Sequence, residues 1–146
     1  MISLIQRVTR ARVSVDGETV GAIGPGLLAL VAVEPDDTDK QARRLLERLL
    51  GYRLFEDAEG RMNRSLVDTQ GGLLLVPQFT LAADTRKGMR PSFATAAEPA
   101  FARRMYEHLL TLAGDAWPGV ENGRFGAHMV IDLVNDGPTT FWLHAR

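Results

Sequence analysis

One stretch of this sequence is apolar at every position: Leu27-Leu28-Ala29-Leu30-Val31-Ala32-Val33. A strand with one face in water alternates apolar and polar residues, whereas a strand covered on both faces is apolar throughout. The stretch is therefore predicted to be a central strand, buried on both faces. A second apolar run, Leu73 to Val76, follows the pair Gly71-Gly72 and predicts another buried strand.

Further strands are predicted around these two runs. The pair Asp16-Gly17 lies between two β-prone segments and is a strong signal for a hairpin turn. Asp57 to Gly60 is predicted to form another turn. Besides the two apolar runs, the predicted strands span residues 2–8, 12–15, 19–23, 125–133 and 139–143, with a short one at 52–55.

Two main helices are predicted from apolar residues at helical spacing. The first begins at Thr38, which forms a capping-box pattern with Gln41, and Gly51 is predicted to end it. The second begins near Pro99, because proline is tolerated in a first helical turn, and is predicted to end at Gly114. The apolar stripe of this second helix consists of Phe101, Met105, Leu109 and Leu112.

The chain shows no repeat, low-complexity tract or linker, so residues 1–146 are predicted to form one domain. Many strands with two helices predict an α/β fold built on a mixed, largely antiparallel sheet. The chain has 45% hydrophobic and 24% charged residues, as a globular domain has.

No signal-peptide layout is present, and no apolar run approaches the ~20 residues that a membrane helix needs. A cytoplasmic location is therefore expected. The chain has no cysteine, which excludes disulfides, thiolate zinc sites and cysteine nucleophiles.

The net charge of −1 predicts that any contact with RNA is local rather than spread over a basic surface. Two candidate basic patches are present, and solvated surface charge is the alternative explanation for both. The patches are Arg7-Arg10-Arg12 and Arg86-Lys87-Arg90.

Common catalytic arrangements of side chains are missing from the sequence. The three histidines, at positions 108, 128 and 144, share no metal-ligand spacing and are expected to be structural or surface residues. No glycine-rich phosphate loop and no Gly-x-Ser-x-Gly elbow is present. Acid–base catalysis by side chains therefore has no clear candidate, and neither a metal nor a cofactor is expected.

Two short motifs remain. Asn135-Asp136-Gly137-Pro138 carries a Gly-Pro turn into a β-prone segment. An ordinary turn before the last strand explains it. However, an X-Pro bond adopts cis at a cost of only about 0.5–1 kcal/mol, and glycine lets both carbonyls approach a ligand closely. The second motif, Val76-Pro77-Gln78-Phe79-Thr80-Leu81, ends the second buried run.

With the opening segment 1–8 and the segment 86–93, these motifs closely resemble the D-aminoacyl-tRNA deacylase family over essentially the whole chain. The resemblance implies an α/β fold with helices and a second sheet layer against the main sheet, assembled as a homodimer. It implies a metal-free hydrolase that cleaves the ester between a D-amino acid, or glycine, and the acceptor end of tRNA. A non-catalytic RNA-binding module of the same fold and a small D-amino-acid esterase are the rival hypotheses.

The resemblance also implies roles for named residues. Gln78, Phe79 and Thr80 would line the pocket, and the backbone N–H groups of Phe79 and Thr80 would form an oxyanion hole. The neighbouring 2′-hydroxyl of the terminal ribose would help to activate water. Thr80 could instead be a nucleophile, but no base stands beside it in the sequence, and an unactivated hydroxyl is weak. Met89 and Phe93 could pack near the terminal adenosine, although core packing explains such residues more often.

For the second motif, the resemblance implies that Gly137-Pro138 is cis and enters the active site of the partner subunit. Its carbonyls would hold the ammonium group of the substrate and exclude an L side chain. Arg7 would brace this turn, or would be a plain surface arginine. Two residues depart from the family pattern, because Pro77 stands where serine is usual and Thr139 where valine is usual. These departures put strict D-selectivity in question, rather than ester hydrolysis.

Overall fold

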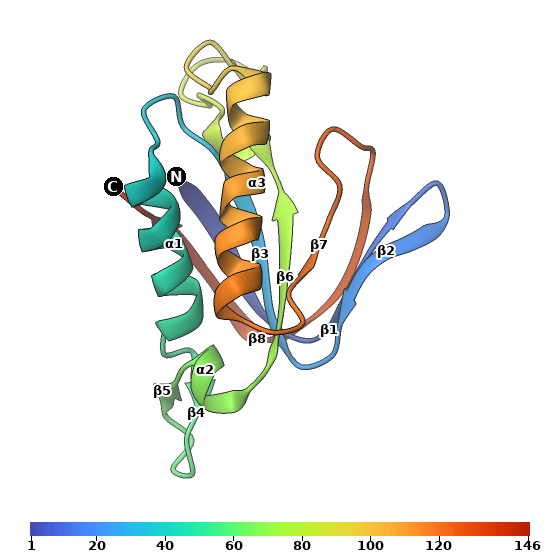
Figure 1. Ribbon diagram of the computed structural model, residues 1–146, viewed down its shortest axis with the longest axis vertical. Coiled ribbons are helices and arrows are strands. Elements are labelled where there is room, and N and C mark those ends of the chain that lie inside the picture. The colour runs from blue at the N-terminus through green and yellow to red at the C-terminus, as the bar shows by residue number, and fades with distance from the viewer.

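Six strands form the main sheet of this computed structural model, which describes residues 1–146 (Figure 1). The strand order is β2-β1-β3-β6-β7, and β8 pairs with the other edge of β1. The β3–β6 and β6–β7 pairs are parallel, and the three pairs that involve β1 are antiparallel. The predicted mixed sheet is confirmed. The strands are β1 Ile2–Val15, β2 Glu18–Ile23, β3 Gly26–Ala32, β6 Gly72–Pro77, β7 Glu121–Asn122 and β8 Val130–His144.

Two of these strands are longer than the sequence patterns predict. The segments 2–8 and 12–15 are one strand, β1, whose first part pairs with β3 and whose last part pairs with β2. The two predicted C-terminal strands are likewise one strand, β8, while residues 125–129 precede it as a loop. Shifts in the β1–β8 register on either side of Val8 interrupt the pattern without ending the ladder. The prediction of separate strands is therefore wrong at both places.

Helices α1 (Asp39–Gly51) and α3 (Pro99–Ala116) cover one face of the sheet, and a short helix, α2 (Leu66–Thr69), contacts α1. Gln41 accepts a hydrogen bond from the Thr38 N–H at 2.9 Å, which confirms the predicted capping box. Pro99 opens α3 as predicted. The stripe of α3 is confirmed at Leu109, which is fully buried, whereas its other three members are partly buried against the core.

The predicted helix end at Gly51 is confirmed, whereas the predicted end at Gly114 is wrong. Gly51 is the last residue of α1, and the capping residue after it, Tyr52, is extended. Gly114 lies inside α3, which continues to Ala116. Neither glycine has the positive φ that favours glycine at a helix end, so neither acts as a left-handed cap.

The opposite face of the sheet is covered in part by the sheet itself. The last part of β1, together with β2 and the start of β8, folds over β3 and β6 and encloses a second, smaller apolar core. The second layer implied by the family resemblance therefore comes from the curled main sheet. The one separate sheet is the hairpin of β4 (Phe55–Glu56) and β5 (Met62–Arg64), whose β4 overlaps the predicted short strand. The residues of the smaller core are Val8, Ala11, Val13, Leu28, Leu74 and Val76.

Part of this face remains uncovered. Leu4 pairs with Leu30 on β3 and with Trp142 on β8, so the three side chains form a row across three strands. None of them is fully buried, and Trp142 is 51% exposed. The row is an apolar strip that this chain covers only in part.

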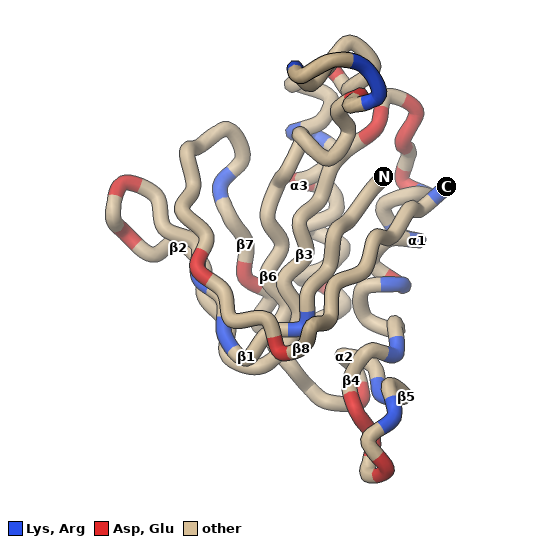
Figure 2. The backbone as a smooth tube through the Cα atoms, turned by 180° about the vertical axis from the view of Figure 1, so that it is seen from behind, with Lys and Arg blue, Asp and Glu red and all other residues tan.

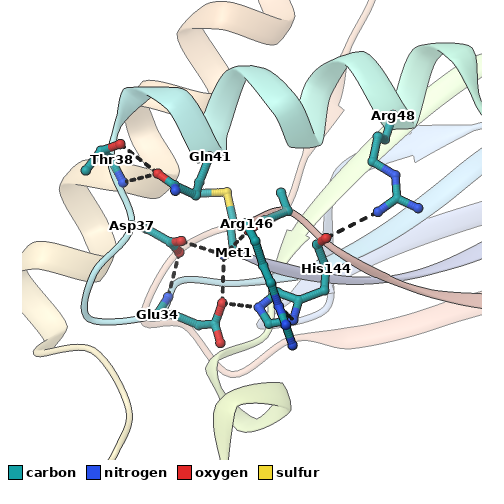
Figure 3. Close-up of polar contacts among 9 residues, drawn as sticks. Met1, Glu34, Asp37, Thr38, Gln41, Arg48, His144 and Arg146 are labelled. Carbon is teal, nitrogen blue, oxygen red and sulfur yellow. Dashed lines mark hydrogen bonds and ion pairs between the residues drawn. The ribbon is translucent and has the colours of Figure 1, made fainter.

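Charged residues lie mainly on the helices, hairpins and loops, and β3 and β6 carry none (Figure 2). One ionic cluster joins the ends of three elements (Figure 3). The Met1 ammonium is buried and contacts Glu34 Oε2 at 2.8 Å and the carboxylate of Asp37. His144, at the end of β8, contacts the same Glu34 oxygen at 2.6 Å. None of the helices combines the length and the apolar character that crossing a bilayer requires.

Candidate active site

The candidate site begins where β6 ends. After Pro77, the Gln78 N–H donates to the Val31 carbonyl at 2.7 Å and holds the chain against β3. A 3₁₀ turn, η1 (Phe79–Ala82), follows directly. Leu81 N–H donates to the Gln78 carbonyl at 3.2 Å and closes the first turn.

The N–H groups of Phe79 and Thr80 are left free by this geometry. The first N–H groups of a helical turn have no acceptor within the turn. No side chain and no carbonyl outside the regular elements accepts a hydrogen bond from either group. Both residues are exposed, so the two adjacent donors can reach a ligand. Two such donors can stabilise a negative charge on one oxygen.

The Thr80 hydroxyl has one hydrogen-bond partner, the side-chain amide of Gln78, which donates to it. No carboxylate, imidazole or amine contacts this hydroxyl. An amide cannot take up the proton of an attacking hydroxyl. No base is therefore in contact with the Thr80 hydroxyl to activate it as a nucleophile.

A cavity of about 430 Å³ opens beside these residues. Pro77, Gln78 and Phe79 form one wall, and Pro77 contributes an apolar ring where serine would place a hydroxyl. The start of α3 and the loop before β8 form the other walls. The sequence patterns do not indicate that this loop lines the cavity, because they predict a strand at residues 125–133. Gly123 and Gly126 could have indicated this loop, since glycines are common in loops, and Gly126 has a φ of 80°. The remaining lining residues are Ala97, Pro99, Ala102, Phe125, Gly126, Ala127, Met129 and Ile131.

The two apolar residues of the 86–93 segment lie outside the core. Phe93 packs against Phe79 with ring centroids 5.1 Å apart, which places it at the rim of the site. Met89 is 99% exposed. Core packing, the more common explanation for such residues, is therefore wrong for both.

The Gly137-Pro138 bond is cis, and both residues are exposed on β8. The side chain of Asn135 spans the turn: its amide donates to the Thr139 carbonyl at 2.9 Å and to the Arg7 carbonyl at 3.0 Å. Its Oδ1 accepts from the Thr139 N–H at 3.2 Å. The turn is therefore fixed by hydrogen bonds within β8 and to β1.

Arg7 is buried and contacts the same turn. Its Nε donates to the Asp136 carbonyl at 2.9 Å, and its terminal nitrogen donates to the Leu54 carbonyl at 2.7 Å. A plain surface arginine, the alternative for Arg7, is excluded by this burial. Thr139 is also buried, and its hydroxyl has no hydrogen-bond partner.

The two motifs lie at opposite ends of the sheet. Val8 pairs with Asn135 on β8 and with Gly26 on β3, and Gly26 pairs with Gly72, where β6 begins. The Gly-Pro turn on β8 is therefore level with the start of β6, with β1 and β3 between them, whereas Pro77 is at the end of β6 (Figure 1 shows these strands). The five steps from residue 72 to residue 77 span about 17 Å. Within one chain, the Gly-Pro turn does not reach Phe79 or Thr80.

No titratable side chain lines the cavity. His108 contacts Asp39 at 2.6 Å and links α3 to α1, and His128 lies exposed in the loop before β8. Partial burial raises the pKa of Glu34. The hydrogen bonds from the Met1 ammonium and His144 outweigh this effect and lower its pKa below the usual value. Burial raises the pKa of Tyr106, whose hydroxyl donates to the Leu75 carbonyl at 3.0 Å.

Comparison with known proteins identifies the family. The family model for D-Tyr-tRNA(Tyr) deacylase matches residues 4–144. The D-aminoacyl-tRNA deacylases of Thioalkalivibrio sulfidiphilus and Xanthomonas campestris are 68% and 66% identical to this chain. These matches cover 98% of this chain in both cases, and 96% and 99% of the relatives.

Two solved structures share the fold. A protein named c-Myc DNA Unwinding Element Binding Protein matches with a TM-score of 0.95 and 36% identity, over 100% of this chain and 99% of its own. A probable eukaryotic D-amino acid tRNA deacylase matches with a TM-score of 0.80 and 21% identity, over 97% of each chain. By its sequence match over nearly its whole length, this chain belongs to the D-Tyr-tRNA(Tyr) deacylase family.

Proposed function

We propose that this protein is a cytoplasmic, homodimeric hydrolase that cleaves the ester bond of D-aminoacyl-tRNA and releases the free D-amino acid and tRNA. The observation that carries the proposal is the pair of free N–H groups at Phe79 and Thr80, beside an apolar cavity and without an acid or base. The relatives that share two thirds of its residues are named for this activity.

In the proposed reaction, water adds to the ester carbonyl and negative charge develops on the carbonyl oxygen. The Phe79 and Thr80 N–H groups donate to that oxygen, and one such donor contributes about 2.7–4 kcal/mol to a transition state of this kind. The bond to the ribose oxygen then breaks, and that oxygen leaves with a proton. The 2′-hydroxyl of the terminal ribose helps to activate the water, so the chain needs neither a metal nor a cofactor.

Selectivity for the D-amino acid is assigned to Gly137-Pro138 of the second copy. Their carbonyls hold the substrate ammonium group, and an L side chain would collide with this main chain. The hydrogen bonds from Asn135 and Arg7 prevent the turn from moving aside. A 10⁴-fold rejection needs about 5.5 kcal/mol, which a collision with fixed backbone can supply. Glycine has no side chain to collide, so glycyl-tRNA is also a substrate.

Two features support a dimer in which each copy completes the other's site. Within one chain, Gly137 and Phe79 lie at opposite ends of the sheet, so the two motifs can meet only between copies. The apolar strip of Leu4, Leu30 and Trp142 is only partly covered in one chain, and the outer edge of β8 is unpaired. Exposed apolar strips and open edges of this kind are typical of association surfaces.

Release of the amino acid from D-Tyr-tRNA and L-Tyr-tRNA tests the proposal directly. We expect hydrolysis of the D-form and of glycyl-tRNA, with the L-form left intact. Tight binding of both tRNAs without hydrolysis would instead identify a nucleic-acid-binding module, a rival favoured by the name of one relative of the same fold. Equal turnover of a free D-tyrosine ester and of D-Tyr-tRNA would identify a small D-amino-acid esterase.

A further inference from the structure

A closed loop stands at the rim of the candidate site. The Asp84 N–H donates to the Ser92 carbonyl at 2.8 Å, and the Ser92 N–H donates to the Asp84 carbonyl at 3.0 Å. These two bonds fix both ends of the loop. Phe93, the next residue, packs against Phe79. The contact between Phe93 and Phe79 therefore holds the loop next to η1, which carries the free N–H groups.

The loop carries an excess of positive charge. Its three basic residues and one carboxylate leave a formal charge of +2, in a chain whose net charge is −1. Arg86 is held by Asp84, with Nε to Oδ1 at 2.9 Å and the terminal nitrogen to Oδ2 at 2.7 Å. Lys87 and Arg90 are exposed and form no ion pair. Two free cations thus lie three residues apart on one loop (Figure 2).

The other basic patch of the sequence does not offer this arrangement. Arg7 is buried against the Gly-Pro turn, and Arg12 pairs with Asp132 at 2.9 Å. Only Arg10 of that patch is free. It also lies on β1 near the start of β6, at the end of the sheet away from Phe79.

We propose that Lys87 and Arg90 bind backbone phosphates at the acceptor end of tRNA, and thereby supply most of the salt-dependent affinity for the substrate. The inference rests on the proposed function. An ester bond seated at the Phe79 N–H places the terminal ribose at the rim of the cavity. The preceding nucleotides then leave across that rim, where the loop is fixed. The Asp84–Arg86 pair sets the shape of the loop and leaves the other two cations for the RNA.

The test compares a double variant, K87A/R90A, with a charge-matched control, K40A/R61A. Lys40 lies in the first turn of α1 and Arg61 lies between β4 and β5; both are exposed and unpaired. Two substrates are used: a tRNA acceptor-stem minihelix charged with D-tyrosine, and 3′-O-D-tyrosyl-adenosine, which has no phosphate. kcat/KM is measured for each protein between 50 and 300 mM salt, and a thermal melt checks the fold of each variant.

For K87A/R90A we expect kcat/KM on the minihelix to fall at least tenfold at low salt, through KM. The slope of log kcat/KM against log salt should become shallower by about 1.4–1.8, since each phosphate contact contributes about 0.7–0.9. Turnover of 3′-O-D-tyrosyl-adenosine should stay unchanged, and K40A/R61A should behave as wild type on both substrates. A slope that changes no more than in K40A/R61A, or an equal loss on both substrates, overturns the inference. If the wild-type protein hydrolyses neither substrate, the proposed function itself fails.

Discussion

At Phe79 the proposed chemistry belongs to a main-chain N–H, so its test must remove that donor rather than the side chain. Phe79→Pro does so, and proline fits the first position of a helical turn. We expect kcat for D-Tyr-tRNA to fall roughly 10²–10³-fold, as for loss of one oxyanion donor. Phe79→Ala keeps the donor and should retain most of kcat in single-turnover assays.

Thr80→Ala separates the same mechanism from its rival. The Thr80 hydroxyl contacts only the Gln78 amide, so its removal should cost less than tenfold in kcat. A loss as large as that of Phe79→Pro would identify Thr80 as the nucleophile. A Phe79→Pro variant no slower than Phe79→Ala would remove the backbone donor from the mechanism.

Thr139 buries a hydroxyl that has no partner. A buried, unsatisfied polar group costs about 1–3 kcal/mol, and valine has nearly the shape of threonine. Thr139→Val should therefore raise the free energy of unfolding by about 1 kcal/mol, measured by urea denaturation. Thr140→Val is the control, because the exposed Thr140 hydroxyl accepts from Gln6 at 3.2 Å, and no gain is expected there. Equal effects of the two substitutions would contradict this account.

At the scale of elements, the sequence predicted those parts whose signals are local. The hairpin at Asp16-Gly17 and the start of α1 at Thr38 depend on a few adjacent residues, and both are present. The helix end at Gly51 is also confirmed, whereas the end predicted at Gly114 is wrong, because a glycine permits a left-handed cap without requiring one. Helix α2 was missed, although Ser65 and Asp68 form a capping box at its start.

The continuity of β1 and β8 has a different cause. Each strand has an interruption near its middle, where the β1–β8 register shifts on both sides of Val8. The sequence shows this interruption as a break in alternation, which is equally typical of a loop. Each strand continues past its interruption because it pairs with other strands on both sides of it. Such pairing is a long-range property that local sequence patterns do not contain.

The cluster around Glu34 joins β1, the loop before α1 and the end of β8, and it gives stability a pH dependence (Figure 3). Because the pKa of Glu34 is lower in the folded protein, the unfolded state binds the extra proton. The contribution of Glu34 is therefore complete above its unfolded pKa of about 4.3 and is lost as the pH falls through the folded value.

Glu34→Gln should accordingly destabilise the protein most above about pH 5, with the difference from wild type shrinking as the pH falls below about 4. Urea unfolding at several pH values measures this difference. Glu47→Gln, at an exposed position on α1, is the matched control and should follow the wild-type profile. A Glu34→Gln difference that is constant across this range would show that the carboxylate charge is not what stabilises the cluster.

At the scale of the whole molecule, the sequence identified both motifs of the site but could not place them relative to each other. The register of β3 and β6 sets Gly137 near the start of β6 and Phe79 beyond its end. That separation follows from the order and pairing of strands. The family resemblance alone led us to expect a second copy. Because of this separation, the proposed mechanism also requires a second copy to bring Gly137 and Phe79 together.

A complementation experiment tests that requirement. Phe79→Pro removes a donor on one side of the proposed shared site, and Gly137→Ala alters the other side. A Cβ at Gly137 would lie 2.0 Å from the Thr139 nitrogen and 2.6 Å from Asn135 Oδ1, so the turn must shift. Each variant alone should have little activity on D-Tyr-tRNA.

When the two variants are mixed in equal amounts and allowed to exchange subunits, half of the dimers contain one copy of each. Such a dimer joins a normal Phe79 from one copy to a normal Gly137 from the other at one of its two sites, so roughly a quarter of the wild-type activity should return. If each site were built within a single chain, no normal site would form and the mixture would stay inactive. Refolding the variants separately before mixing, without exchange, supplies the control, and recovery of activity there as well would contradict the shared site.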